Sequence, residues 1–386
     1  MSHEQALSAP PVATIEQVGV RKRRYRYDVL RVIAAICIIV FHFEAEFVSR
    51  GIGGSSPSHT GFALNMFGLH LSMGSLSICV FFMLSGMLSA KDIDNPSFKT
   101  WPYYRKRFLR LFIPFYIAYF VVYTVNILRG SVAFQVPAPY FLLTVFGLDG
   151  YLSSSFAPLS IPSFYLIGEW FFGALVVVTV LWPLIRWMLA KWSYVSLVVL
   201  FVLEILIPVI ASHVGMIPDV LRYPTGCIAT FTLGAVISKY RIKHATDRTA
   251  LRKMWTLGLV MTVVAMCSTM VPGQYMGALR NQMLAAGIII IVDFTGFRNK
   301  PSHQENNTGT HRLIVLLSDL SMYAFLFQHV IIVDVLNSVS GIADSNHGFS
   351  TIDYYCLMCF IIILVFAIAF VVSEFENAIR QKLRNR

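Results

Sequence analysis

Three side chains that can exchange a proton, His42, Glu169 and His329, lie within or at the start of long apolar stretches. An ionisable group inside such a stretch is costly and therefore marks a candidate functional site. His42 follows Asp28 by 14 residues and His329 follows Arg312 by 17, or about 21 and 25 Å along a helix that rises 1.5 Å per residue. If the stretches alternate across a membrane, all three groups share one depth. The alternative is a packing role, in which each group bonds a neighbouring helix.

Arginines gather at the opposite ends of these stretches. Arg107 and Arg110 are three residues apart, so they face the same side of a helix. Arg31 and Arg110 lie inside apolar segments rather than before them, which a simple topology signal does not require. Guanidinium groups suit phosphate. The pattern predicts a phosphate-bearing donor that binds at the arginine end and reacts at the histidine end.

The composition requires a membrane setting. Hydrophobic residues make up 56% of the 386 residues and charged residues only 13%, about half the share usual in soluble domains. This excludes an ordinary soluble enzyme, a disordered chain and a secreted scaffold. We expect an all-α, polytopic integral membrane protein with about ten transmembrane helices of ~20 residues. They cover 28–48, 68–90, 107–128, 164–187, 193–212, 222–240, 254–272, 279–298, 313–337 and 352–374.

The basic residues agree with this count. With the N-terminus in the cytoplasm, 27 of the 31 Lys and Arg residues fall on the cytoplasmic side and four on the outer side, as the positive-inside rule requires. One missed helix would invert every later loop. We therefore expect both termini in the cytoplasm and a multi-pass protein of the cell (inner) membrane. Loop bias and contact with anionic membrane lipids account for the net charge of +11 without nucleic acid.

The chain divides into a flexible cytoplasmic tail over 1–20, a transmembrane domain over 21–378 and a basic cytoplasmic tail over 379–386. All six cysteines lie in apolar runs without the spacing of metal ligands, so we expect neither disulfides nor a bound metal. A shorter apolar patch over 140–148 cannot span the membrane and is expected to lie at its surface or to re-enter it.

Six motifs follow one another along the apolar stretches. They are RYDVLR over 26–31 leading to Phe41-His42, FFMLSGML over 81–88, RFLR over 107–110 with Pro114 and Tyr116, EWF over 169–171 with Pro183, FTLGA over 231–235, and SMY from 321 leading to His329. Their order resembles the acyltransferase-3 family of bacterial membrane acyltransferases, over residues from about 24 to 380. Val32, Gln328 and Ala378 depart from the residues common in that family. No SGNH-type hydrolase domain follows, so the resemblance implies the stand-alone form.

The resemblance implies transfer of an acyl group, most often acetyl, from cytoplasmic acyl-CoA to a sugar hydroxyl near the outer surface. Acyl-CoA and a carbohydrate would then be the partners. The CoA phosphates would lie on Arg31, Arg107 and Arg110, and the pantetheine arm would run between helices. His42 would act as the general base, since neutral imidazole suits that task. Glu169 or another carboxylate would orient it. His329 would assist or stabilise the oxyanion, a task that backbone amides near Ser85 and Gly86 could also perform. Direct transfer and an acyl-histidine intermediate both stay open.

Two other functions compete with this hypothesis. In a secondary transporter or flippase for a lipid-linked sugar, the polar groups within the membrane would relay protons. The sequence has neither the inverted repeat nor the paired Gly/Pro-broken helices that indicate such transporters. A structural assembly factor would leave the shared depth of the His and Glu residues unexplained. The oligomeric state is not fixed by the sequence.

Overall fold

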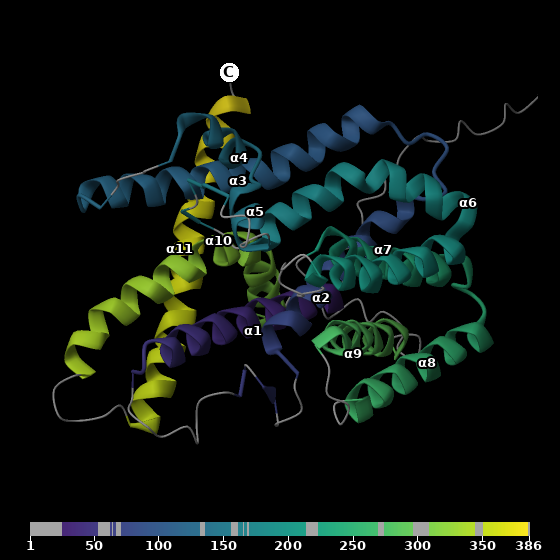
Figure 1. The fold of residues 1–386 in the computed structure, drawn as a ribbon. Coiled ribbons are helices and arrows are strands. Elements are labelled where there is room, and N and C mark those ends of the chain that lie inside the picture. Colours follow the sequence, from purple (N-terminus) through teal and green to yellow (C-terminus); the bar gives the residue numbers. More distant parts are fainter. Residues whose placement is uncertain are drawn as a thin grey trace, which may run out of the picture.

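All regular secondary structure is helical over the residues that the computed structural model describes, as Figure 1 shows. These are 25–52, 62–63, 65–66, 71–131, 136–155, 161–164, 166–167, 170–213, 223–268, 274–295, 309–343 and 350–384. The α-helices are α1 Tyr25–Ser49, α2 Met73–Ser89, α3 Thr100–Leu128, α4 Phe141–Val145, α5 Asp149–Ser155, α6 Trp170–His213, α7 Pro224–Lys243, α8 Arg248–Cys267, α9 Gln274–Phe294, α10 Gly309–Ala343 and α11 Thr351–Arg384.

Eight of the described helices are long and apolar enough to cross a membrane, so the protein is a polytopic membrane protein. The sequence predicts about ten spans, and two features explain the difference. The range of α6 covers two predicted spans, 164–187 and 193–212, because it consists of two helices that meet at a kink at Trp192, whose backbone leaves the helical conformation (φ −138°, ψ 51°). Helix α7 covers a further predicted span but is less apolar, since it carries Thr and Gly residues and ends on Arg241 and Lys243.

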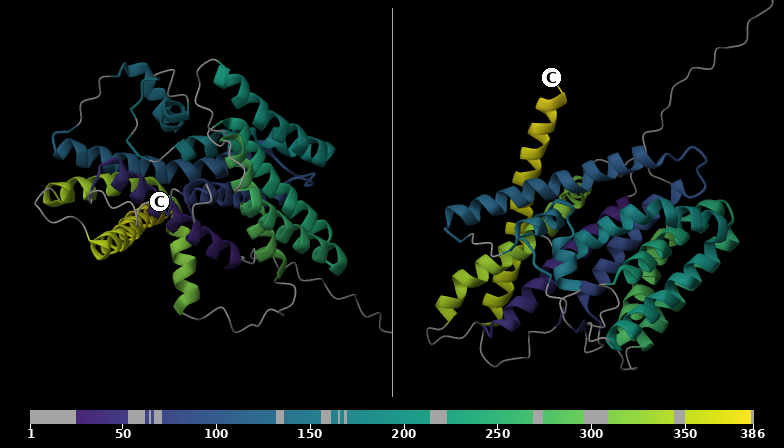
Figure 2. Two further views of the ribbon diagram at one scale, coloured as in Figure 1. Left: turned by 60° about the horizontal axis from the view of Figure 1, so that its bottom comes forward. Right: turned by 45° about the horizontal axis from the view of Figure 1, so that its top comes forward.

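The centre of the bundle is formed by α1, α2 and α10. Helix α1 packs against both others, while α10 also contacts α3 and α11. On the opposite side, α2 packs against α7 and α9, α8 covers α9, and α6 lies against α7. Figure 2 shows α11 extending beyond its neighbours at its C-terminal end. Helices α1, α2 and α10 are therefore enclosed by other helices. The polar residues of the first and last motifs lie on two of these central helices, α1 and α10.

Two glycines from different motifs let α2 and α7 approach closely. A Cβ atom built on Gly86 would lie 1.9 Å from the carbonyl oxygen of Phe231, and one on Gly234 would lie 2.2 Å from that of Met83. Both obstacles are backbone atoms, which cannot rotate aside. Small residues commonly permit such contact between membrane helices. The FFMLSG and FTLG motifs thus form one helix–helix contact.

Replacing Gly86 or Gly234 with alanine is expected to destabilise the protein by about 1–3 kcal/mol, the usual cost of overpacking. Gly277 offers a matched control, because it lies in α9 with nothing within 4 Å of an added Cβ. There alanine should be neutral, or stabilising by up to about 1 kcal/mol. Thermal unfolding in detergent micelles measures the three variants. Equal melting temperatures for all of them would contradict the close contact.

The apolar patch over 140–148 does not span the bundle. A 3-10 turn over Ala138–Tyr140 is followed by α4, and the next helix, α5, packs against α6. The Tyr116 hydroxyl of α3 donates to the Val145 carbonyl at 2.6 Å. Phe141 and Leu142 are exposed on α4, as is Phe146 directly after it. The patch therefore forms a short helix on the outside of the bundle, as both a surface helix and a re-entrant piece would.

Candidate active site

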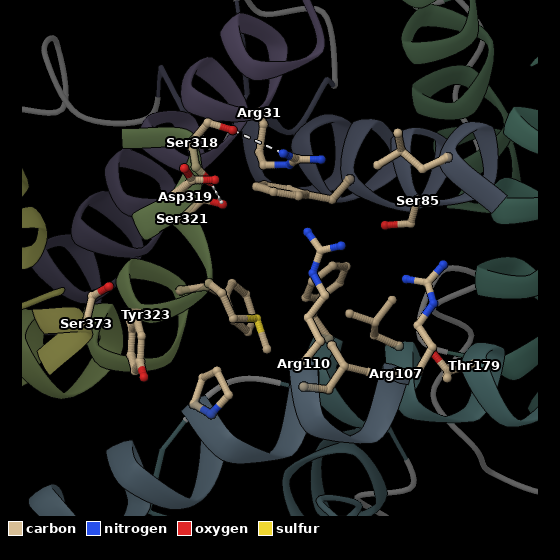
Figure 3. A pocket seen from close by; sticks show the side chains of 18 of the residues that line it. Arg31, Ser85, Arg107, Arg110, Thr179, Ser318, Asp319, Ser321, Tyr323 and Ser373 are labelled. Atoms are coloured by element: carbon tan, nitrogen blue, oxygen red, sulfur yellow. Dashed lines mark hydrogen bonds between the residues drawn. The ribbon is translucent and has the colours of Figure 1, made fainter. Parts of the chain in front are cut away.

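A cavity of about 330 Å³ opens between α1, α2, α3, α6, α10 and α11. Four arginines line it, so we call it the arginine cavity: Arg31, Arg107, Arg110 and Arg380. Figure 3 shows Arg107 and Arg110 rising side by side from α3 toward Ser85, with Arg31 entering from α1. The three arginines predicted from sequence are thus brought together by two helices far apart in the chain.

Arg31 is held by a hydrogen-bonded group at the edge of the cavity. Its Nη1 donates to Ser318 Oγ at 3.1 Å, and that hydroxyl donates to Asp28 Oδ1 at 2.7 Å. The guanidinium also lies 3.5 Å from Asp28, whose side chain is buried. One serine on α10 therefore links Asp28 and Arg31 of α1, and none of the sequence motifs points to it.

Ser318→Ala should destabilise the protein by about 1–3 kcal/mol, because the buried Asp28 carboxylate loses a donor. Ser338 on the same helix is a matched control, since it is exposed and its hydroxyl bonds only the preceding turn. Ser338→Ala should stay within about 0.5 kcal/mol of the wild type. Thermal unfolding in micelles compares the two, and equal losses would refute the linking role of Ser318.

Arg107 is oriented by neighbours on both its sides. Its Nη2 donates to Ser89 Oγ of α2 at 2.7 Å, and the guanidinium carbon lies 5.6 Å from the ring centre of Tyr103. Ser89 in turn donates to the carbonyl of Ser85. The guanidinium is therefore already placed for a ligand, which reduces the ordering cost of binding.

The far wall of the cavity is polar as well. Glu376 of α11 accepts a hydrogen bond from the Tyr323 hydroxyl of α10 and pairs with Arg380 one turn later. The sequence places Arg380 in the expected basic tail, yet α11 continues through residue 384 and brings it to the cavity. The spacing of four residues between Glu376 and Arg380 was the available signal, since it puts both on one face.

The two predicted histidines meet at the other end of the central helices. The rings of His42 and His329 lie edge to face, with centroids 6.0 Å apart and planes at 82°. Both side chains are partly buried. Glu169 lies outside the described residues, directly before α6 begins at Trp170. Nearby Phe171 packs on Phe325, with ring centroids 4.9 Å apart.

A small cavity of about 10 Å³ lies between the histidines and the arginine cavity. We call it the neck; it is lined by Ala35, Ile38, Phe81, Ser321, Phe325 and Gln328. Three of these, Phe81, Ser321 and Phe325, also line the arginine cavity. Ile38 precedes His42 by four residues and Phe325 precedes His329 by four, or about one helical turn each. The neck therefore adjoins the arginine cavity and lies about one helical turn from each histidine.

A family model described as an acyltransferase domain matches residues 24–373. The chain belongs to the acyltransferase 3 family. This membrane acyltransferase therefore uses an acyl donor and an acceptor. No curated protein and no solved structure matches the chain. The matched range contains all six motifs, and five of them contribute residues to the arginine cavity, the neck or the histidine pair.

The arrangement gives the acyltransferase a polar cavity on one side and a pair of imidazoles on the other, with the small neck cavity between them. Such a division separates the binding of a charged donor from proton transfer at the reacting group. Among the described residues, no three His, Cys, Asp or Glu side chains are grouped to hold a metal ion. Within this part of the chain, the groups next to the neck that suit acid–base chemistry near neutral pH are the two histidines.

Proposed function

We propose that this acyltransferase transfers an acyl group, acetyl in the simplest case, from cytoplasmic acyl-CoA to a hydroxyl of a glycan at the outer surface. The observation that carries the proposal is the arginine cavity, which shares wall residues with the neck, itself about one helical turn from the histidine pair. A donor with a phosphate-rich head and a thin thioester arm matches that shape.

The head of the donor would bind at the arginines. Arg31, Arg107 and Arg110 offer planar groups that make paired hydrogen bonds with phosphate, and Arg380 adds a fourth positive charge nearby. The positive-inside distribution supports placing this end in the cytoplasm, where acyl-CoA is found. The N-terminal end of α1 then faces the cytoplasm, and the histidine pair lies in the outer half of the membrane.

The chemistry would take place beside His42. Its neutral imidazole accepts the proton of the sugar hydroxyl, and the oxygen attacks the thioester carbonyl carbon. A C–O bond forms and the C–S bond breaks. The thiolate of CoA leaves and takes up the proton from the imidazolium. His329 lies close enough to hold the His42 ring or the developing negative charge, and Glu169 would orient the base.

The sidedness of the reaction gives a direct test, because acetyl-CoA does not cross membranes. Inside-out and right-side-out vesicles are prepared from the cells that make the protein, so that the natural acceptor is present. Radiolabelled acetyl-CoA is added outside. We expect base-labile label in glycan only in inside-out vesicles, and in right-side-out vesicles only after detergent. Vesicles from cells that lack the protein are the control.

Two outcomes would overturn the proposal. Label in neither orientation after detergent would exclude acetyl-CoA as the donor, and a longer acyl-CoA would be tried next. Movement of a lipid-linked sugar across the vesicle membrane without any acyl donor would favour the transporter hypothesis instead.

A further inference from the structure

Gln328 is a buried polar residue in the wall of the neck, and its amide makes no hydrogen bond to the part of the chain that the structure describes. Its side chain is 0% exposed, and neither its Nε2 nor its Oε1 has a hydrogen-bond partner among the described residues. A buried amide without partners costs free energy, and native proteins rarely keep one. An amide retained in a cavity wall therefore indicates a ligand that completes its hydrogen bonds.

The position of Gln328 on α10 specifies where that ligand would lie. Ser321, Phe325 and Gln328 are spaced by four and three residues and share the face of α10 that lines the neck. The next residue is His329, whose ring meets that of His42. The amide thus lies between the arginine cavity and the histidine pair, along the path of the proposed donor.

A second buried glutamine shows what a packing role looks like in this protein. Gln282 of α9 is also buried, but its Nε2 donates to Thr230 Oγ1 at 2.7 Å and to the Glu204 carboxyl group. These bonds join three helices, α6, α7 and α9. Gln328 makes no comparable bond within the described residues, so packing between helices does not account for it.

We propose that Gln328 binds the carbonyl oxygen of the acyl group during transfer and is therefore a catalytic residue. This assignment rests on the proposed function. When the sugar oxygen attacks, the carbonyl electron pair moves onto this oxygen, and the Nε2–H of Gln328 donates to it. The carbonyl then re-forms as the C–S bond breaks. The neck has room for roughly one water-sized group, which suits a carbonyl oxygen.

Gln328→Leu and Gln328→Met test this assignment, because both fill the space without a donor. In the vesicle assay we expect the kcat for acetyl transfer to fall by about 10²–10³, the usual loss for one oxyanion donor. The KM for acetyl-CoA should stay unchanged, since the arginines still hold the phosphates. The melting temperature in micelles should stay equal or rise, because an unpartnered buried amide has been removed.

Gln282→Leu is the matched control, with the same chemical change at a glutamine that has partners. It should lower the melting temperature, because Glu204 and Thr230 lose their donor. Full turnover by both Gln328 variants would overturn the assignment and leave the proposed function intact. A fall in turnover matched by a fall in melting temperature in both variants would show a structural role and also overturn it. If the wild-type protein transfers no acetyl group, both the proposed function and this assignment of Gln328 are wrong.

Discussion

Replacing His42 with alanine is expected to abolish acyl transfer, with at least a 10³-fold loss within the roughly 10²–10⁴ range of general-base catalysis. Among the described residues next to the neck, His329 is the other group suited to take the hydroxyl proton near neutral pH. Insertion into the membrane should be unaffected, because His42 is only partly buried and alanine suits the helix. Transfer of label in the vesicle assay, with protein amount in the membrane measured in parallel, provides the test.

His213→Ala is the matched control for His42. This residue ends α6 and is exposed, so its loss should leave transfer unchanged. His329→Ala separates the roles within the pair. If His329 acts through His42, the double variant should be no worse than His42→Ala alone, as expected for residues that act as a unit. Normal transfer by His42→Ala would remove it from the mechanism.

Arg107→Ala is expected to weaken acetyl-CoA binding by about 10- to 150-fold, which corresponds to the roughly 1.5–3 kcal/mol of a charged hydrogen bond. The guanidinium is already oriented by Ser89 and Tyr103, so little ordering cost offsets its contribution. The effect should appear in the KM for acetyl-CoA and much less in kcat. Arg107→Lys should recover only part of it, because an ammonium group lacks the planar pair of donors.

Arg105→Ala gives the control for charge alone. Arg105 is an exposed arginine of the same helix and does not line the cavity, so its removal changes the net charge equally. It should leave the KM close to that of the wild type. Equal effects of the two alanine variants would mean that Arg107 acts through the general positive field rather than by contact. Desulfo-CoA as a competitor reports binding without chemistry and distinguishes the two cases.

The helical membrane architecture followed from the sequence because hydropathy and basic loops each constrain it. Counting residues along the predicted helices placed His42 and His329 at one depth, and their rings do meet. Spacing likewise put Arg107 and Arg110 on one face, and both line the same cavity as Arg31. These positions could be predicted because a membrane fixes the direction and length of each helix.

Other features depended on contacts between helices, which the pattern of one chain does not encode. Ser318 is an ordinary helical serine until α10 lies beside α1 and brings it to Asp28 and Arg31. In the sequence, Gln328 stands out only as a departure from a family pattern. That its amide has no hydrogen-bond partner within the described ranges becomes visible only in three dimensions. The two predicted spans 164–187 and 193–212, by contrast, match the kink at Trp192 that divides α6.

The narrowness of the neck also bears on the electrical insulation of the membrane. A route from the arginine end to the histidine end is a potential leak for ions and protons. With about 10 Å³ of space between Phe81, Phe325 and their neighbours, a hydrated ion does not fit, and stripping its water among apolar side chains is prohibitively costly. Under the proposed function, the neck must widen to admit the uncharged thioester arm. At its width in this structure, it keeps the membrane potential from dissipating through the enzyme.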